Sequence, residues 1–214
     1  MKKRVFKISL IVVFLLILTG LFSIVAKEKR SNREQFFSTY SLSDEEVDLL
    51  QDGDIILRKG YGIVSENIAK YLDEEYVISH CGIVVKSQKG NYFVIHSVSG
   101  RLSEDDGVQV CSLKRFCKES ILNSIIVVRL REDNRMLISQ DAKRYLKAKV
   151  PFDNSFSLED QSKIYCSELV WKILLDNYDL NIYPVDKRPD NLQFKSFYDP
   201  QWFDIIINHH TKNQ

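Results

Sequence analysis

The most apolar helical stretch of this chain begins with the segment Tyr165-Cys166-Ser167-Glu168-Leu169-Val170. Its apolar positions recur at i, i+3, i+4, i+7 and i+8, one face of a helix, at Cys166, Leu169, Val170, Ile173 and Leu174. A cysteine at a helix N-terminus lies in a partial positive charge that lowers the pKa of its thiol. The segment therefore predicts a buried helix whose first residue, Cys166, is a candidate thiolate nucleophile. The alternative is a buried thiol with only a structural role.

A second segment that carries chemistry is Ser79-His80-Cys81-Gly82-Ile83-Val84-Val85. It is rich in β-branched residues and predicts a strand with His80 at its start. An imidazole beside a thiol takes up the thiol proton, so His80 is the candidate base for Cys166. Gly82 shares the face of His80 and leaves space beside the ring, whereas Cys81 points to the opposite face and is expected in the core.

Residues 80–85 and 92–98 are predicted to form an antiparallel hairpin with a longer loop. If the turn is centred on Gln88, His96 lies opposite His80; a centre half a residue later puts Ser97 there instead. On the same face, the His96 ring can hydrogen-bond His80 and fix the tautomer that accepts the thiol proton. The alternative for each histidine is a side chain of the core or the strand with no catalytic role.

The remaining pattern predicts more strands and helices around this hairpin. Strands are expected at residues 55–57, 108–113 and 124–130, and helices at residues 43–50, 61–72 and 136–150. Ser43 and Glu46 have the spacing of a capping box. From residue 183 onward we expect a loop-rich wrap with a frayed polar end that includes His209 and His210. These elements predict an α+β fold with one antiparallel sheet packed against helices.

The N-terminus predicts a signal peptide or a membrane anchor. Four basic residues lie within residues 1–7, and residues 8–26 carry no charge. The uncharged run exceeds the roughly 7–15 residues usual for a signal peptide, which favours an uncleaved anchor over a cleaved signal. The predicted organisation is this segment at residues 1–26, a polar linker at 27–42 and a single domain at 43–214. The domain is then expected outside the cytoplasmic membrane, in the cell envelope, either membrane-anchored or secreted.

Charge and cysteine content exclude several classes of function. The formal net charge is +1 with both signs interspersed, which argues against a nucleic-acid partner. The four cysteines are too few for a disulfide framework; Cys111 and Cys117 are interpreted as a local bridge or as two half-buried thiols. No cysteine or histidine spacing matches a zinc site, so we predict no metal and no cofactor. Nothing in the sequence indicates an oligomeric state.

Three motifs in this order resemble the circularly permuted papain-like hydrolases of the NlpC/P60 superfamily, and most of all the YiiX/YaeF-like amidases. They are residues 50–56, 79–84 and 165–170, and the resemblance spans about residues 50–177. It implies a permuted papain-like fold with Cys166 as nucleophile, His80 as general base and then acid, and His96 at a third polar position that varies in the superfamily. Asp153 resembles part of the family's aromatic-Asp element and is expected to hold a loop.

The sequence thus predicts a thiol hydrolase that cleaves an amide or ester through a Cys166 acyl-enzyme. Backbone amides at the helix start are expected to hold the oxyanion. Cell-wall peptide and lipid or acyl substrates both remain open, as does contact with a membrane through the N-terminal segment. The alternative is a non-catalytic envelope module that binds wall peptide or lipid in the same cleft.

Overall fold

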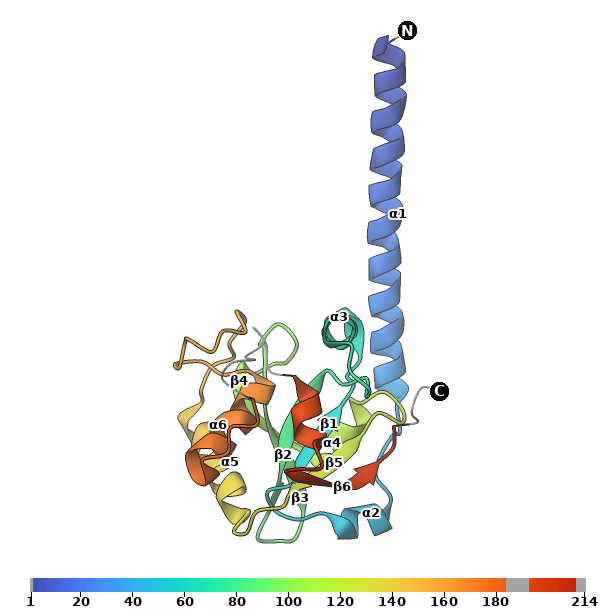
Figure 1. The fold of residues 1–214 in the computed structure, drawn as a ribbon. Helices are drawn as coiled ribbons and strands as arrows, with labels where there is room; N and C mark the ends of the chain where they lie inside the picture. The colour runs from blue at the N-terminus through green and yellow to red at the C-terminus, as the bar shows by residue number, and fades with distance from the viewer. Residues whose placement is uncertain (1, 184–192, 211–214) are drawn as a thin grey trace.

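Figure 1 shows the computed structural model, which describes residues 2–183 and 193–210, with side chains described from residue 13. A long N-terminal helix projects from a globular part in which one sheet is flanked by helices. The sheet has six antiparallel strands in the order β4-β3-β2-β1-β5-β6. The strands are β1 (Ile55–Arg58), β2 (His80–Lys86), β3 (Tyr92–Val98), β4 (Gly107–Ser112), β5 (Ile126–Leu130) and β6 (Phe203–Asn208). This arrangement confirms the predicted α+β class.

The helices lie at the predicted places, with two additions. They are α1 (Lys2–Phe37), α2 (Asp44–Leu49), α3 (Gly62–Leu72), α4 (Leu113–Lys118), α5 (Met136–Ala148), α6 (Cys166–Tyr178) and the 3₁₀ helix η2 (Phe194–Tyr198). The capping box of α2 is confirmed, because Ser43 Oγ accepts from the Glu46 amide at 3.3 Å and Glu46 Oε2 accepts from the Ser43 amide at 2.8 Å. The additions are α4 and η2.

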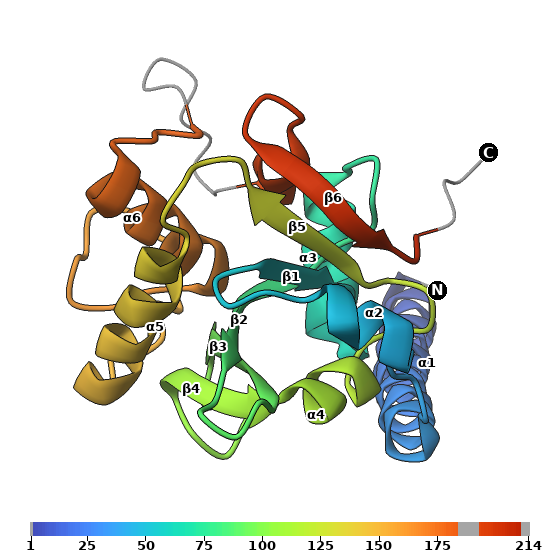
Figure 2. The same ribbon diagram turned by 90° about the horizontal axis from the view of Figure 1, so that it is seen from below.

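Strand alternation divides the core into two clusters, one on each face of the sheet. We call the first the α6 face; it includes Ile55, Leu57, Cys81, Ile83 and the apolar stripe of α6. We call the second the α4 face; it includes Ile56, Val84, Val94, Phe116 and Cys117. Figure 2 shows α5 and α6 together at one side of the sheet, away from α4 and α2. Successive residues of β1 and β2 therefore face different cores.

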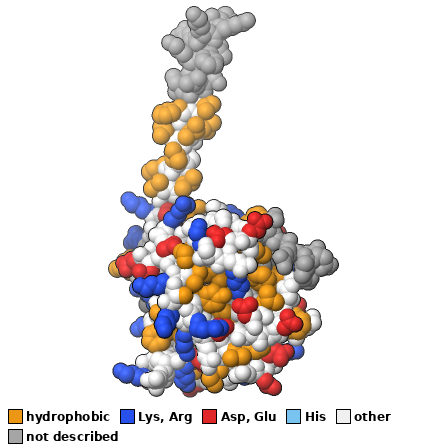
Figure 3. All heavy atoms as spheres, turned by 90° about the vertical axis from the view of Figure 1, so that its left-hand side faces the viewer, with side chains coloured by type: hydrophobic (Ala, Val, Ile, Leu, Met, Phe, Trp, Pro, Cys, Tyr) orange, Lys and Arg blue, Asp and Glu red, His pale blue; other side chains and the backbone are white. Residues whose placement is uncertain are grey.

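The helix α1 continues through much of the predicted linker, to Phe37. Its lower end contacts α3, where Ser31 Oγ accepts from the Gly62 amide at 2.7 Å and a Glu28 oxygen accepts from the Ile63 amide at 2.9 Å. Large apolar side chains between Val13 and Val25 are 45–75% exposed, and Figure 3 shows them along the projecting helix. Among the residues that the structure describes, we find no helix with the length and apolarity needed to cross a membrane.

The C-terminal segment is more ordered than the sequence indicated. Residues 203–208 form β6 against β5, and the His209 amide continues the pairing by donating to the Ile125 carbonyl at 2.9 Å. The His209 ring lies between Tyr40 Oη and Glu46 Oε1, each at 2.5 Å from a ring nitrogen. The prediction of a frayed end at His209 and His210 is therefore wrong, because β-pairing and these side-chain contacts fix the segment.

A buried ion pair joins the start of β1 to β5. Asp54 is fully buried and accepts from Arg129 Nε and Nη2, both at 2.8 Å, and from the Gln51 amide at 2.8 Å. Arg129 Nη2 also donates to the Leu49 carbonyl at 2.8 Å. The pair thus connects the end of α2, the turn before β1 and the centre of the sheet.

We expect Asp54→Ala to lower the free energy of unfolding by about 3–5 kcal/mol, because it leaves the Arg129 guanidinium without its buried partner. The matched control is Asp204→Ala, which removes the exposed pair between Asp204 and Arg131 at 2.6 Å and is expected to cost about 0–1 kcal/mol. Urea denaturation measures both. Equal losses in the two variants would contradict the assigned role of Asp54.

Candidate active site

Cys166 is the first residue of α6, as the sequence predicted. Tyr165 before it has extended backbone angles, φ −99° and ψ 173°, and so ends the preceding segment. The Glu168 carboxylate reaches back to the Tyr165 amide at 3.4 Å and pairs with Lys172 Nζ at 3.2 Å. These contacts satisfy a helix-start amide and fix the first turn, which holds the Cys166 side chain at a defined place on the α6 face.

The thiol of Cys166 has its polar neighbours on α6 and β2. The Cys81 thiol donates a hydrogen bond to its sulfur, and this bond, with the backbone amides of Cys81, Ser167 and Cys166, lowers the pKa of Cys166 against the opposing effect of burial. Burial and the Cys166 sulfur raise the pKa of Cys81 well above its usual value. Cys166 is therefore the member of the pair that ionises.

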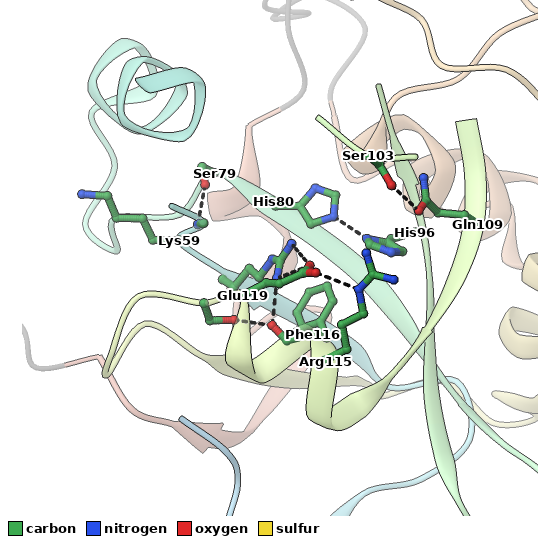
Figure 4. Close-up of polar contacts among 12 residues, drawn as sticks. Lys59, Ser79, His80, His96, Ser103, Gln109, Arg115, Phe116 and Glu119 are labelled. Atoms are coloured by element: carbon green, nitrogen blue, oxygen red, sulfur yellow. Dashed lines mark hydrogen bonds and ion pairs between the residues drawn. The ribbon is translucent and has the colours of Figure 1, made fainter. Parts of the chain in front are cut away.

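The two predicted histidines lie in contact with each other. His80 Nε2 and His96 Nδ1 are 2.8 Å apart, and both rings pack against Phe116, as Figure 4 shows. The pairing of Ile83 with Ile95 places the hairpin centre at Lys89 rather than Gln88, so His96 is two residues out of the predicted register. A shift of two residues keeps His96 on the face of His80, so the predicted contact between the rings forms.

Gly82 makes this contact possible by leaving the face open beside the rings. A Cβ atom at residue 82 would lie 2.5 Å from Val94 Cγ1, closer than packed atoms allow, and 3.1 Å from His96 Cβ, which is a tight contact. The space beside the histidine pair therefore depends on a residue without a side chain.

The electrostatic surroundings keep both histidines neutral. Burial, followed by the charges of Arg58 and Arg115, lowers the pKa of His96 to about 3. Burial also lowers the pKa of His80 well below its usual value, with smaller effects from Arg58 and His96. The Arg58 guanidinium stacks on Phe116 at 4.2 Å and its Nη1 donates to the Phe116 carbonyl at 2.8 Å. A neutral imidazole is the form that accepts a proton.

The structure does not bring Cys166 into contact with the histidines. Cys81 and Cys166 belong to the α6 face, whereas the rings of His80 and His96 lie on Phe116, in the α4 face. Over the described residues, no hydrogen bond joins the Cys166 thiol to either ring. The expected position of Cys81 on the face opposite His80 is confirmed, and Cys166 lies on the Cys81 side.

The segment before Cys166 is tied to the sheet and to residues 151–153. Ser97, fully buried on β3, donates from Oγ to the Ile164 carbonyl at 2.7 Å. The Ile164 amide donates to the Pro151 carbonyl at 3.0 Å. Asp153 accepts from the Ser155 and Ser157 amides at 2.9 and 2.7 Å, which agrees with its predicted loop-holding role.

An apolar pocket opens beside Cys166. Its volume is about 320 Å³. Its lining residues come from α3, from the residue before β2, from the segment before α6, from the start of α6 and from η2: Asn67, Ile68, Tyr71, Leu72, Ser79, Phe156, Tyr165, Cys166, Ser167 and Phe194. The sequence predicted a helix at residues 61–72, but no local pattern indicates that Ile68 and Tyr71 of this helix lie beside Cys166. Phe194 lies in the tail for which the sequence predicted loops.

The remaining cysteines are free and buried. Cys111 and Cys117 lie in the α4 face, so the structure has no bridge between them. Within the described part of the chain, no group of three or more His, Cys, Asp or Glu side chains is placed to hold a metal ion.

Comparisons with known proteins agree with this architecture. Residues 49–197 match a family described as permuted papain-like amidase enzymes, YaeF/YiiX, C92 family. A crystal structure of the metalloprotein yiiX from Escherichia coli O157:H7 superposes with a TM-score of 0.58 at 22% sequence identity, covering 74% of this chain and 97% of that one. A search of curated proteins found no match. The structural likeness supports the fold.

We expect the free energy of unfolding to fall as the pH is lowered from about 6.5. A histidine with a pKa of about 3 when folded and about 6.5 when unfolded binds its proton mainly in the unfolded state over that window. The stabilisation that comes from the neutral, buried His96 is therefore fully present above about pH 6.5 and is lost as the pH falls. His96→Gln should reduce the slope of stability against pH by up to about 1.4 kcal/mol per pH unit. Urea denaturation between about pH 5 and 7.5 measures both slopes; identical slopes would refute the buried neutral state of His96.

Proposed function

Because the chain belongs to the permuted papain-like amidase family, we propose that it is a cysteine hydrolase in which Cys166 attacks the carbonyl carbon of an amide or ester. The observation that carries the proposal is the setting of Cys166, at the start of α6, with backbone amides around its sulfur and an apolar pocket beside it. Attack forms a thioester with the acyl group, and the amine or alcohol leaves. Water then releases the acid and restores the thiol.

In the proposed reaction, His80 takes the Cys166 proton and later gives it to the leaving group. Before the transfer, His96 holds the His80 ring through their 2.8 Å contact and fixes its tautomer. Amides at the start of α6 stabilise the oxyanion. In the described conformation the His80 ring lies on the α4 face, so this transfer requires the ring to leave its contact with His96 and turn from the start of β2 toward Cys166. His80 is the first residue of that strand.

The pocket favours an acyl substrate over a cell-wall peptide. Its walls are aliphatic and aromatic side chains, including Ile68, Leu72, Phe156 and Phe194. These groups are suited to an alkyl chain, since burial of each methylene group contributes about 0.8 kcal/mol. A charged wall peptide would find few polar partners there. We therefore propose a lipid ester or acyl amide as the substrate class.

A second candidate function is a non-catalytic module that binds a lipid or a wall peptide in the same pocket. The observation that favours it is the separation of Cys166 and His80 onto different faces of β2. Such a module uses the pocket without any need for a thiol–imidazole contact.

We further propose that α1 holds the domain at the cell envelope. The uncharged run of residues 8–26 and the exposed apolar side chains between Val13 and Val25 support attachment to a lipid surface. The globular part, with interspersed charges in Figure 3, then stands clear of that surface.

The structural relative yiiX is a metalloprotein, but the donor set of the present chain does not fit a metal centre at the proposed site. His80 and His96 supply two side chains, and one nitrogen of each is engaged in their mutual contact. No step of the proposed reaction passes through a metal.

We expect the parent protein to release acyl groups from a lipid extract and to leave a muropeptide mixture unchanged, with products identified by mass spectrometry. Cys166→Ala should abolish turnover, and His80→Ala should lower kcat by about 10²–10⁴-fold, the usual contribution of a general base. Cys117→Ala, which removes a buried thiol on the α4 face, is the matched control and should keep the parent rate. Turnover of muropeptides alone would overturn the substrate assignment. Lipid binding that survives Cys166→Ala, with no turnover in the parent, would favour the binding module.

We expect the full chain to sediment with membranes after cell fractionation. A variant that begins at residue 27 should remain in the supernatant, since it lacks the exposed apolar side chains. Equal distribution of the two proteins would contradict envelope attachment through α1.

A further inference from the structure

We propose that Cys81 and Cys166 form a reversible disulfide when a hydroperoxide reaches the pocket, so that the α6 face holds an oxidative modification site. The modification uses the Cys166 thiol but does not require the hydrolase reaction. It therefore stands or falls separately from the proposed function.

The first support is the contact between the two residues. The stripe of α6 packs against β2 on the α6 face, and both cysteines belong to that cluster. The Cys81 thiol donates its hydrogen bond to the Cys166 sulfur. The two sulfur atoms are thus neighbours in the folded chain, and both thiols are free.

The second support is the unequal access of the two thiols. Cys166 lines the pocket and is 8% exposed, whereas Cys81 is fully buried. A small oxidant entering the pocket therefore meets Cys166 first. Cys81 is placed behind it, in the position of a thiol that resolves an oxidised partner.

The third support is the location of the other cysteines. Cys111 and Cys117 lie in the α4 face, on the far side of the sheet from Cys166. They compete neither for Cys166 nor for Cys81. Within the described structure, oxidation therefore has a single neighbouring thiol to which Cys166 can be joined.

The chemistry proceeds in two balanced steps. The Cys166 thiolate attacks the terminal oxygen of the hydroperoxide; a sulfur–oxygen bond forms, the oxygen–oxygen bond breaks, and the alcohol leaves with a proton. Cys81 then attacks the sulfur of the resulting sulfenic acid; the disulfide forms, the sulfur–oxygen bond breaks, and water leaves. Two thiols are oxidised by two electrons in total, and the hydroperoxide is reduced to alcohol and water.

The disulfide would remove the nucleophile and also protect it. A sulfenic acid without a neighbouring thiol is oxidised further to the sulfinic acid, which thiol reductants do not reverse. A bond to Cys81 stops oxidation at a stage that dithiothreitol reverses. The pair thus converts a damaging reaction into a reversible one.

The test treats the full chain with hydrogen peroxide, blocks remaining thiols with iodoacetamide and maps peptides by mass spectrometry without reduction. We expect a cross-linked peptide containing Cys81 and Cys166, with loss of Cys166 alkylation, and recovery of that alkylation after dithiothreitol. In Cys81→Ser and Cys81→Val we expect no cross-link and Cys166 converted to sulfinic acid. Two variants are used because they differ in polarity, so that a folding defect in one leaves the other informative.

Cys117→Ala is the matched control and should cross-link as the parent does. A parent in which Cys166 becomes sulfinic acid at the rate of the Cys81 variants would overturn the proposal, as would a cross-link from Cys166 to Cys111 or Cys117. A cross-link in a protein without turnover on any substrate would uphold the modification site and reject the hydrolase. Turnover that peroxide does not affect would uphold the hydrolase and reject the modification site.

Discussion

The packing of α6 against β2 is the contact on which the rest of this structure depends. It buries the apolar stripe that includes Leu169, Val170 and Ile173, and it fixes where the helix begins. Each buried side chain of this size contributes about 1.5–3 kcal/mol, so the first residue of the helix is held by many contacts that have no chemical role. The position of Cys166 follows from this packing and from the cap that Glu168 provides.

A β-strand presents alternate residues to opposite sides, and β2 applies this rule to neighbouring reactive groups. His80 joins His96 and Phe116 on the α4 face, while Cys81 joins Cys166 on the α6 face. The neighbouring residues His80 and Cys81 thus belong to two separate pairs, an imidazole pair on one face of the sheet and a thiol pair on the other. Any chemistry that combines them requires the His80 side chain, at the first residue of β2, to leave the α4 face.

Local patterns were sufficient to predict much of the fold. Periodicity located α6 and the β2–β3 hairpin, and the capping box located α2, because these features depend on neighbours in sequence. The predicted register of the β2–β3 hairpin was wrong by two residues. The register depends on the geometry of the loop, which the composition of residues 86–91 does not define. The strand β6 was missed because residues 203–208 follow a segment rich in proline, and their partner β5 lies far away in sequence. Local patterns also could not predict which face of the sheet α6 packs against, because both faces of the sheet are apolar.

The contact between Tyr40 and His209 joins residues at the two ends of the globular part, with 2.5 Å between Tyr40 Oη and the ring nitrogen. The ends of this domain are thus neighbours in space, and a short peptide could join them once α1 is removed. If the new N- and C-termini were placed within residues 154–163, no strand or helix of the globular part would be interrupted. In such a rearranged chain the cysteine would precede the histidine, the order of unpermuted papain-like enzymes. The same three-dimensional arrangement is therefore compatible with either position of the chain termini, and the permutation changes the order of the segments in the sequence without changing the fold.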